Sequence, residues 1–168
     1  MLDTHTLKHH KNNPPLLLPN ESVMRSGDYY DYIELSEDNQ FMVCIADVSG
    51  KGIPAALLMS NFQAVLRTLS RKGQGLEDVI HELNYQLVAN ANGENFITFF
   101  VAVYDYEAKD LRYVNAGHNP PVLLKQGGVV QQLTEGTTIL GAFEPLPFLS
   151  TGSVEDVEAF SLFLFTDG

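Results

Sequence analysis

The sequence lacks the features that mark disulfide-rich, membrane-spanning and nucleic-acid-binding proteins. A single cysteine, Cys44, excludes an intrachain disulfide and is compatible with the cytosol. No apolar run reaches the ~20 residues that a membrane-spanning helix needs, and residues 1–13 lack the apolar core of a secretory signal. Lysine and arginine number 10 against 21 aspartates and glutamates, and the net charge of -11 disfavours nucleic acid and anionic membranes as partners. We therefore expect a cytoplasmic protein that binds neither, with carboxylates that suit cations.

The chain nevertheless has what a folded domain needs. Its 168 residues, 45% of them hydrophobic, are enough for one domain with a core. We expect residues 1–20 to form an N-terminal tail and residues 21–168 to form the domain. The tail carries His5, His9 and His10, which could bind a metal, although a frayed terminus is the simpler interpretation of this polar segment.

The stretch Phe41–Leu58, FMVCIADVSGKGIPAALL, combines an apolar run, a carboxylate, two glycines and a proline. Its first residues form a continuous apolar run, which is typical of a strand buried on both faces. Asp47 follows at the end of that strand, and two glycines then allow a sharp turn. Pro54 suits the first turn of a helix. Cys44 lies within the strand, so we interpret it as a packed apolar residue rather than a reactive thiol.

A second strand is predicted just upstream, over residues 27–36. Strand alternation divides its side chains between two faces, with Asp28, Tyr30 and Tyr32 on one and Tyr29, Asp31 and Ile33 on the other. Asp28 opens this strand and Asp47 closes the next. A hairpin between the two strands would therefore bring both carboxylates to the same end of the sheet.

Helical periodicity follows the glycine turn. Residues 54–71 predict an amphipathic helix with an inner face of Leu57, Leu58, Phe62, Val65, Leu66 and Leu69. Residues 76–91 predict a second helix, packed antiparallel to the first, with an inner face of Val79, Ile80, Leu83 and Leu87. Further strands are predicted over residues 96–106, 111–116, 121–125, 129–133 and 161–165, and residues 136–153 are interpreted as a connector. This order predicts an α+β fold with helices packed on antiparallel sheets.

Three carboxylates lie next to predicted strand boundaries and glycines: Asp28, Asp47 and Asp167. Anions gathered in one pocket repel unless cations neutralise them or one of them holds a proton. Oxygen ligands select hard divalent ions such as Mg²⁺ or Mn²⁺, and two such ions lower the pKa of a shared water, which could then attack phosphorus in line. The alternative is that each aspartate serves only as a turn or capping residue.

His118 lies in the segment NAGHNPP, between a predicted strand and a proline-fixed turn. It could carry a proton near neutral pH, or it could hold the loop through hydrogen bonds. The segment SGKG resembles a phosphate loop but lacks the spacing of a Walker motif, so it gives little support to nucleotide binding.

Four segments, SGDYYD, ADVSGKGIPAALLM, NAGHNPP and LFTDG, together resemble the metal-dependent protein phosphatases. They are most similar to the bacterial SpoIIE/RsbU branch of the protein phosphatase 2C-like superfamily, over residues 26–168. The resemblance implies an α-β-β-α sandwich with antiparallel sheets flanked by helix pairs. It also implies two Mn²⁺ or Mg²⁺ ions and hydrolysis of phosphoserine or phosphothreonine on a signalling protein, usually a STAS-type anti-sigma-factor antagonist. Helix-mediated homodimers are plausible in this branch.

The resemblance also implies roles for single residues. Asp28 matches the first acidic position, which orients metal-bound water, and Asp47 matches the metal-bridging carboxylate. The backbone carbonyl of Val48 and the carboxylate of Asp167 stand where the family binds metal. His118 and Asn119 belong to a family motif and receive no assigned role. The helices over residues 54–91 match a pair that can respond to an upstream regulator.

The sequence departs from the family pattern at both ends of the resemblance. Family members continue past LFTDG to a further strand and another metal-binding aspartate. Upstream, PNESVMRS is a much shorter bridge than usual, and Ser26 replaces a common glycine. We therefore expect an incomplete sandwich: a truncated member, a fragment, or a chain that has lost activity. The alternative to an enzyme is an inactive phosphatase-like module that binds a signalling partner through its helix pair.

Overall fold

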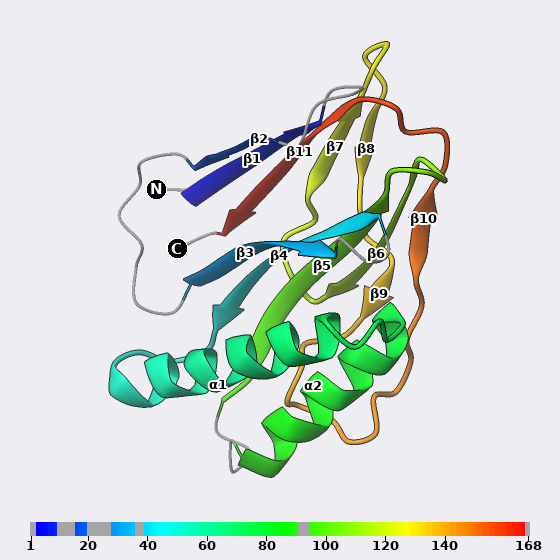
Figure 1. Cartoon of the computed structure of the whole chain (residues 1–168). Coiled ribbons are helices and arrows are strands. Elements are labelled where there is room, and N and C mark those ends of the chain that lie inside the picture. Colours follow the sequence, from blue (N-terminus) through cyan, green and yellow to red (C-terminus); the bar gives the residue numbers. More distant parts are fainter. Residues whose placement is uncertain (1–2, 10–15, 20–27, 36–38, 91–94, 167–168) are drawn as a thin grey trace.

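A computed structural model describes residues 3–9, 16–19, 28–35, 39–90 and 95–166. Two β-sheets stack face to face, and two helices cover the outer face of one of them (Figure 1). The elements are β1 (Asp3–His9), β2 (Leu16–Pro19), β3 (Asp28–Leu35), β4 (Gln40–Val48), α1 (Ile53–Ser70), α2 (Leu76–Asn90), β5 (Ile97–Asp105), β6 (Asp110–Ala116), β7 (Val122–Lys125), β8 (Val130–Gln132), β9 (Gly136–Thr137), β10 (Gly152–Val154) and β11 (Phe160–Thr166). The predicted α+β class is confirmed.

The larger sheet has the order β10-β6-β5-β4-β3, with β9 paired to β6. Its central strands, β4 and β5, are buried on both faces, which explains their continuous apolar sequences. The hairpin predicted between the strands at Asp28 and Phe41 is confirmed, because β3 and β4 pair antiparallel over the full length of β3. Predicted boundaries in this sheet agree with the structure to within one or two residues.

The smaller sheet has the order β2-β1-β11-β7-β8, and two of its strands, β1 and β2, were not predicted from the sequence. Residues 1–20 were expected to form a tail, yet β1 pairs antiparallel with β11 along its whole length. The side chains of His5, Leu7 and His9 are buried between the sheets, so the interpretation as a frayed terminus is wrong for these residues. His9 packs among aromatic rings, and His5 stacks on Tyr30. The segment DTHTLKH alternates with period two, which is the signature of a strand with one buried face.

The helix pair packs on the face of the larger sheet that points away from the smaller one (Figure 1). Pro54 lies in the first turn of α1, as predicted, and Gly52 is its N-cap. Every residue predicted for the inner face of α2 is buried. In α1 the prediction is wrong for Leu57, which is 62% exposed, whereas Phe62, Leu66 and Leu69 are buried. Neither described helix is long and apolar enough to cross a lipid bilayer.

The sandwich has two hydrophobic cores, one on each side of the larger sheet. One core lies between this sheet and the helices, and the other lies between the two sheets. Within the described ranges, no helix covers the outer face of the smaller sheet. The described part therefore supplies three of the four layers expected for an α-β-β-α sandwich.

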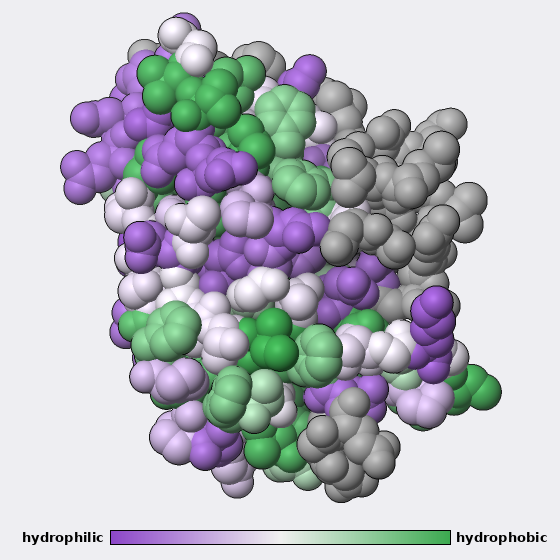
Figure 2. Space-filling model, turned by 180° about the vertical axis from the view of Figure 1, so that it is seen from behind, coloured by the Kyte–Doolittle hydropathy of each residue, from purple (hydrophilic) through white to green (hydrophobic). Residues whose placement is uncertain are grey.

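The segment that was interpreted as a connector, residues 136–153, contains the short strands β9 and β10. Between them the chain passes the middle of α2, where Asn84 binds the backbone of Gly141 and Phe143. Phe143 and Phe148 are more than half exposed on this segment. Seen from behind, apolar surface is scattered over the lower part of the molecule and the tip of the β7–β8 hairpin (Figure 2).

Candidate functional site

Asp28 and Asp47 lie directly opposite each other in the antiparallel pair of β3 and β4. The register makes them Cα partners, and the prediction that a hairpin brings both to the same end of the sheet is confirmed. Residues directly opposite in an antiparallel pair project from the same face of the sheet, within about 5 Å at Cβ. The structure therefore brings together two carboxylates that are nineteen positions apart in sequence.

The face that carries these carboxylates is the one that looks toward the smaller sheet. Residues of β4 that alternate with Asp47, such as Val43 and Ile45, belong to the core between the sheets. Thr98 of β5 is the Cα partner of Asp47 on its other side. From the smaller sheet, the hydroxyl of Thr166 donates a hydrogen bond to Oδ2 of Asp28 at 3.2 Å. The site thus lies at one end of the sandwich, where strands of both sheets meet.

These oxygen donors fit a hard divalent cation. Two facing carboxylates in a half-buried position repel each other, and a bound divalent ion offsets that repulsion. Among the described residues no cluster of three or more His, Cys, Asp or Glu side chains forms a complete metal site. Asp167, the third predicted carboxylate, lies outside the described residues, next to Thr166. Val48, whose carbonyl was predicted to meet a metal, is buried at the end of β4.

His118 is buried between the two sheets at the same end. Its Nδ1 lies 2.9 Å from Oγ1 of Thr98, and its Nε2 lies 3.2 Å from the carbonyl oxygen of Phe165 in β11. Its backbone N–H donates to Oδ1 of Asn115 at 2.8 Å. Of the two interpretations left open, this geometry supports hydrogen bonds that hold the loop. Asn119 is half-buried in the same turn.

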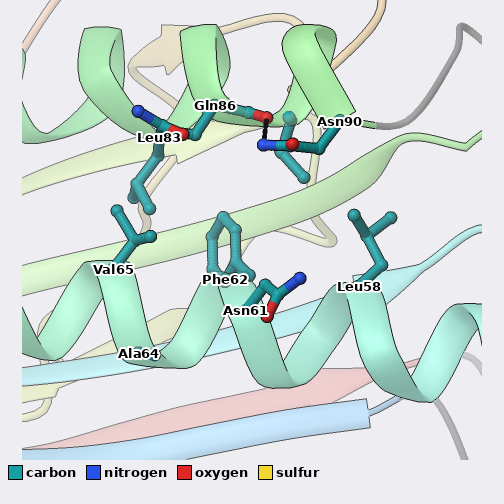
Figure 3. Close-up of a pocket in the computed structure, with 9 residues that line it drawn as sticks. Leu58, Asn61, Phe62, Ala64, Val65, Leu83, Gln86 and Asn90 are labelled. Carbon is teal, nitrogen blue, oxygen red and sulfur yellow. Dashed lines mark hydrogen bonds between the residues drawn. The ribbon is translucent and has the colours of Figure 1, made fainter.

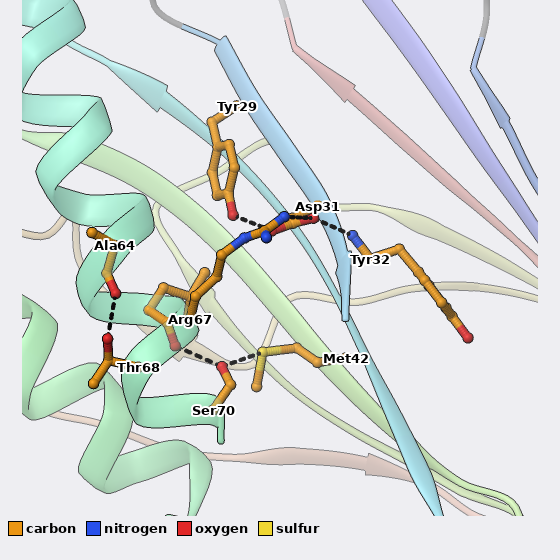
Figure 4. A network of polar contacts seen from close by, with 9 residues as sticks. Tyr29, Asp31, Tyr32, Met42, Ala64, Arg67, Thr68 and Ser70 are labelled. Carbon is orange, nitrogen blue, oxygen red and sulfur yellow. Dashed lines mark hydrogen bonds and ion pairs between the residues drawn. The ribbon is translucent and has the colours of Figure 1, made fainter. Parts of the chain in front are cut away.

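An ion pair that the sequence analysis missed connects α1 to β3 (Figure 4). Arg67 binds the carboxylate of Asp31 with both ends of its guanidinium, and Tyr29 donates its hydroxyl to the same carboxylate at 2.6 Å. These hydrogen bonds raise the pKa of Arg67 above its ordinary value. Burial, followed by the nearby Cys44 and Asp31, raises the pKa of Tyr29, which keeps its hydroxyl protonated as a donor. Asp31 projects from β3 opposite to Asp28, as alternation predicted.

A separate cavity of about 230 Å³ opens between the two helices (Figure 3). Its apolar wall includes Phe62 and Leu83, and its polar groups are the amides of Asn61, Gln86 and Asn90. None of its lining side chains titrates, so this cavity offers no acid, base or nucleophile. The carboxylate end of the sandwich, and not this cavity, therefore supplies the acidic groups of the candidate site.

The single cysteine has no part in the site. Cys44 is fully buried in β4, and burial raises the pKa of its thiol. A protonated thiol without access to solvent is neither a nucleophile nor a metal ligand. The prediction that Cys44 packs as a small apolar residue is confirmed.

Comparison with known proteins identifies the family to which the chain is similar. The family model for Stage II sporulation protein E matches residues 37–168. Phosphoserine phosphatase RsbU of Bacillus subtilis is 39% identical over 95 residues, which cover 56% of this chain and 28% of RsbU.

Solved structures extend the comparison to the fold. The PP2C phosphatase domain of SpoIIE from Bacillus subtilis has a TM-score of 0.66 at 18% identity, covering 92% of this chain and 42% of that one. RsbX in complex with magnesium has a TM-score of 0.68 at 16% identity, and the match covers 99% of this chain and 74% of RsbX. The likeness confirms the predicted protein phosphatase 2C-like fold. Three curated relatives are much longer, since the matches span only 21% to 38% of their length.

Proposed function

Because the chain belongs to the family of Stage II sporulation protein E, we propose that it is a metal-dependent protein serine/threonine phosphatase. The observation that carries this proposal is the pairing of Asp28 with Asp47 at the end of the sandwich, with Thr166 of the other sheet bound to Asp28. Separate strands thereby deliver acidic side chains to one place, which is the arrangement that a phosphate-hydrolysing metal site needs.

Each site residue then has a distinct task. Asp47, together with Asp167 and the carbonyl of Val48, would hold Mn²⁺ or Mg²⁺, and Asp28 would hold metal and orient water. Two ions, when bound, neutralise charge on the phosphoryl oxygens and lower the pKa of water. The hydroxyl of Thr166 restricts the orientation of the Asp28 carboxylate, because one of its oxygens is already a hydrogen-bond acceptor.

The substrate in this proposal is a phosphoserine or phosphothreonine on a cytoplasmic signalling protein. The similarity to RsbU, a phosphoserine phosphatase, supports that class. We infer that a STAS-type anti-sigma-factor antagonist is the partner, and that two copies associate through their helices. The alternative function is an inactive module that binds the same kind of partner without hydrolysing phosphate.

Hydrolysis of a phosphorylated STAS protein and of p-nitrophenyl phosphate, with and without Mn²⁺, tests the proposal. Manganese-dependent turnover should disappear in Asp47→Ala and Asp28→Asn. Glu107→Gln is the matched control, because this exposed acid lies in the turn between β5 and β6. Turnover that persists in Asp47→Ala would contradict the assigned site. A protein without turnover, whose partner binding survives Asp47→Ala, would favour the binding module.

A further inference from the structure

The side chain of His118 connects the two sheets beside the carboxylates. On one side it contacts Thr98, the Cα partner of Asp47. On the other side it contacts the carbonyl of Phe165, whose neighbour Thr166 binds Asp28. One imidazole therefore links the strand beside Asp47 to the strand end that contacts Asp28.

The end of β11 needs such a donor because its neighbour β7 stops short. The register pairs β11 with β7 only over Phe160–Phe163. Continued by two residues, that register would place Phe165 opposite Pro120, which has no N–H to donate. The carbonyl of Phe165 instead accepts from Nε2 of His118. Since a carbonyl oxygen only accepts, Nε2 carries a proton in this contact, and Nδ1 makes the second hydrogen bond with the hydroxyl of Thr98.

The turn that presents His118 is itself held in place. Asn115 donates its backbone N–H to Glu135 and its side-chain amide to Leu133, and its Oδ1 accepts from the backbone of His118. Gly117 has a φ of +68°, and a Cβ at this position would lie 2.6 Å from Ile139. The backbone therefore arrives at His118 in one conformation, which fixes the direction of the ring.

We propose that His118 is a positioning residue that fixes the last residues of β11 against the sheet that carries Asp28 and Asp47. It acts through Thr98 and Phe165, and it sets the spacing between the acidic groups of the two sheets. The link to metal binding rests on the proposed function, whereas the holding of the strand end does not.

Two measurements on the purified 168-residue chain test this role. The first is residue-resolved amide exchange of β11 in metal-free protein, and the second is the Mn²⁺ dissociation constant by calorimetry. His118→Phe keeps a ring and removes both hydrogen bonds, whereas Thr98→Val removes only one and preserves shape. His9→Phe is the matched control, because His9 is also buried between the sheets but pairs with Phe160 at the far end of β11.

In His118→Phe we expect faster exchange confined to residues 164–166, and Mn²⁺ binding weaker by about 10-fold, as for outer-shell partners of metal sites. Thr98→Val should change the amide exchange and the Mn²⁺ affinity in the same direction, but by less than His118→Phe does. His9→Phe should lower the melting temperature yet leave the Mn²⁺ constant within about 2-fold of wild type. Unchanged exchange at residues 164–166 in His118→Phe, or equal loss of Mn²⁺ affinity in His9→Phe, overturns the proposal. If wild-type protein binds no Mn²⁺, the proposed function fails, and the exchange data alone decide whether His118 holds the strand.

Discussion

Arg67 of α1 and Asp31 of β3 form a two-pronged ion pair, with Nε–Oδ2 and Nη2–Oδ1 distances of 2.7 and 2.9 Å. Asp31 lies three residues after Asp28 on the same strand but projects toward the helices. The pair therefore fastens the helix layer to the strand that presents Asp28 on its other face. The side chain of Asp31 is only 11% exposed, so its negative charge needs a cationic partner to offset the cost of burial.

We expect Arg67→Met to lower the free energy of unfolding by about 1–2 kcal/mol, because a mostly buried carboxylate loses its cation. Asp31→Asn in the same chain should recover part of that loss. The free energy of unfolding of Arg67→Lys should lie between those of wild type and Arg67→Met, since an ammonium cannot form the bidentate contact. Urea unfolding of the double-mutant cycle measures the coupling energy.

The pair Lys109–Glu158 is the control for that cycle, since both of its side chains are more than 40% exposed. Its coupling energy should be within about 0.5 kcal/mol of zero. Equal coupling for the two pairs would show that burial of Asp31 has no energetic effect.

The turn before His118 tolerates no Cβ. Gly117→Ala should destabilise the protein by at least about 1 kcal/mol more than Gly127→Ala. Both glycines have positive φ, so both substitutions incur backbone strain of about 1–2 kcal/mol. A Cβ at Gly127 meets nothing within 4 Å, whereas one at Gly117 meets Ile139. Thermal unfolding of the two variants isolates the steric contribution, and equal losses would contradict the close approach.

Asp105 should contribute to stability at neutral pH and lose that contribution in acid. Burial raises its pKa, but hydrogen bonds to its carboxylate outweigh burial and hold the pKa below its ordinary value. The donors are the backbone N–H groups of Glu107 and Ala108 and the side chain of Gln40.

Since the folded-state pKa is depressed, the contribution is complete above the unfolded pKa of about 3.9 and disappears as pH falls through the folded value. Asp105→Asn should lower the free energy of unfolding by about 1 kcal/mol at pH 7. The difference from wild type should shrink below about pH 4. A constant difference from pH 7 to pH 3 in urea unfolding would contradict the assignment.

The thiol of Cys44 should resist modification in the native protein. It is fully buried and its pKa is raised, so the reactive thiolate is both scarce and shielded. Ellman's reagent at pH 8 should label the folded chain slowly and should label one thiol per chain in urea. Rapid labelling without denaturant would mean that β4 opens readily.

Substitutions in α1 should separate its buried and exposed leucines. Leu66→Ala should cost about 2–5 kcal/mol, because Leu66 is fully buried between the helices and the larger sheet. Leu57→Ala should change stability by less than about 0.5 kcal/mol, because Leu57 is 62% exposed. Chemical unfolding measures the stability of both variants. A large loss of stability in Leu57→Ala would indicate that Leu57 packs on the inner face of the helix.

The sequence predicted those elements whose positions depend on a local pattern of apolar and polar residues. Apolar runs located β4, β5 and β11, and alternation along β3 correctly assigned Asp28 and Asp31 to opposite faces of the strand. The placement of Asp28 and Asp47 at the same end of the sheet followed from a short hairpin, whereas their direct pairing is known from the structure.

Contacts between elements distant in sequence were not predictable in this way. The pairing of Thr98 with Asp47, and the contacts of His118 with both sheets, depend on strand register and on how the sheets stack. The prediction for Leu57 was wrong because the apolar face of the helix is wider than the surface that contacts the sheet. Leu57 lies at the edge of that apolar face and remains exposed. β1 was missed because its polar residues hid a period of two.

The pairing of β1 with β11 also has a kinetic consequence. Almost the whole described chain separates His5 from its partner Leu164, so this contact closes one of the longest loops that the fold contains. The larger sheet and its helices, whose partners are mostly neighbours in sequence, can assemble while the polypeptide is still emerging from the ribosome. The smaller sheet must wait for its central strand, and until that strand arrives the apolar side of the larger sheet stays open to chaperones or to other nascent chains.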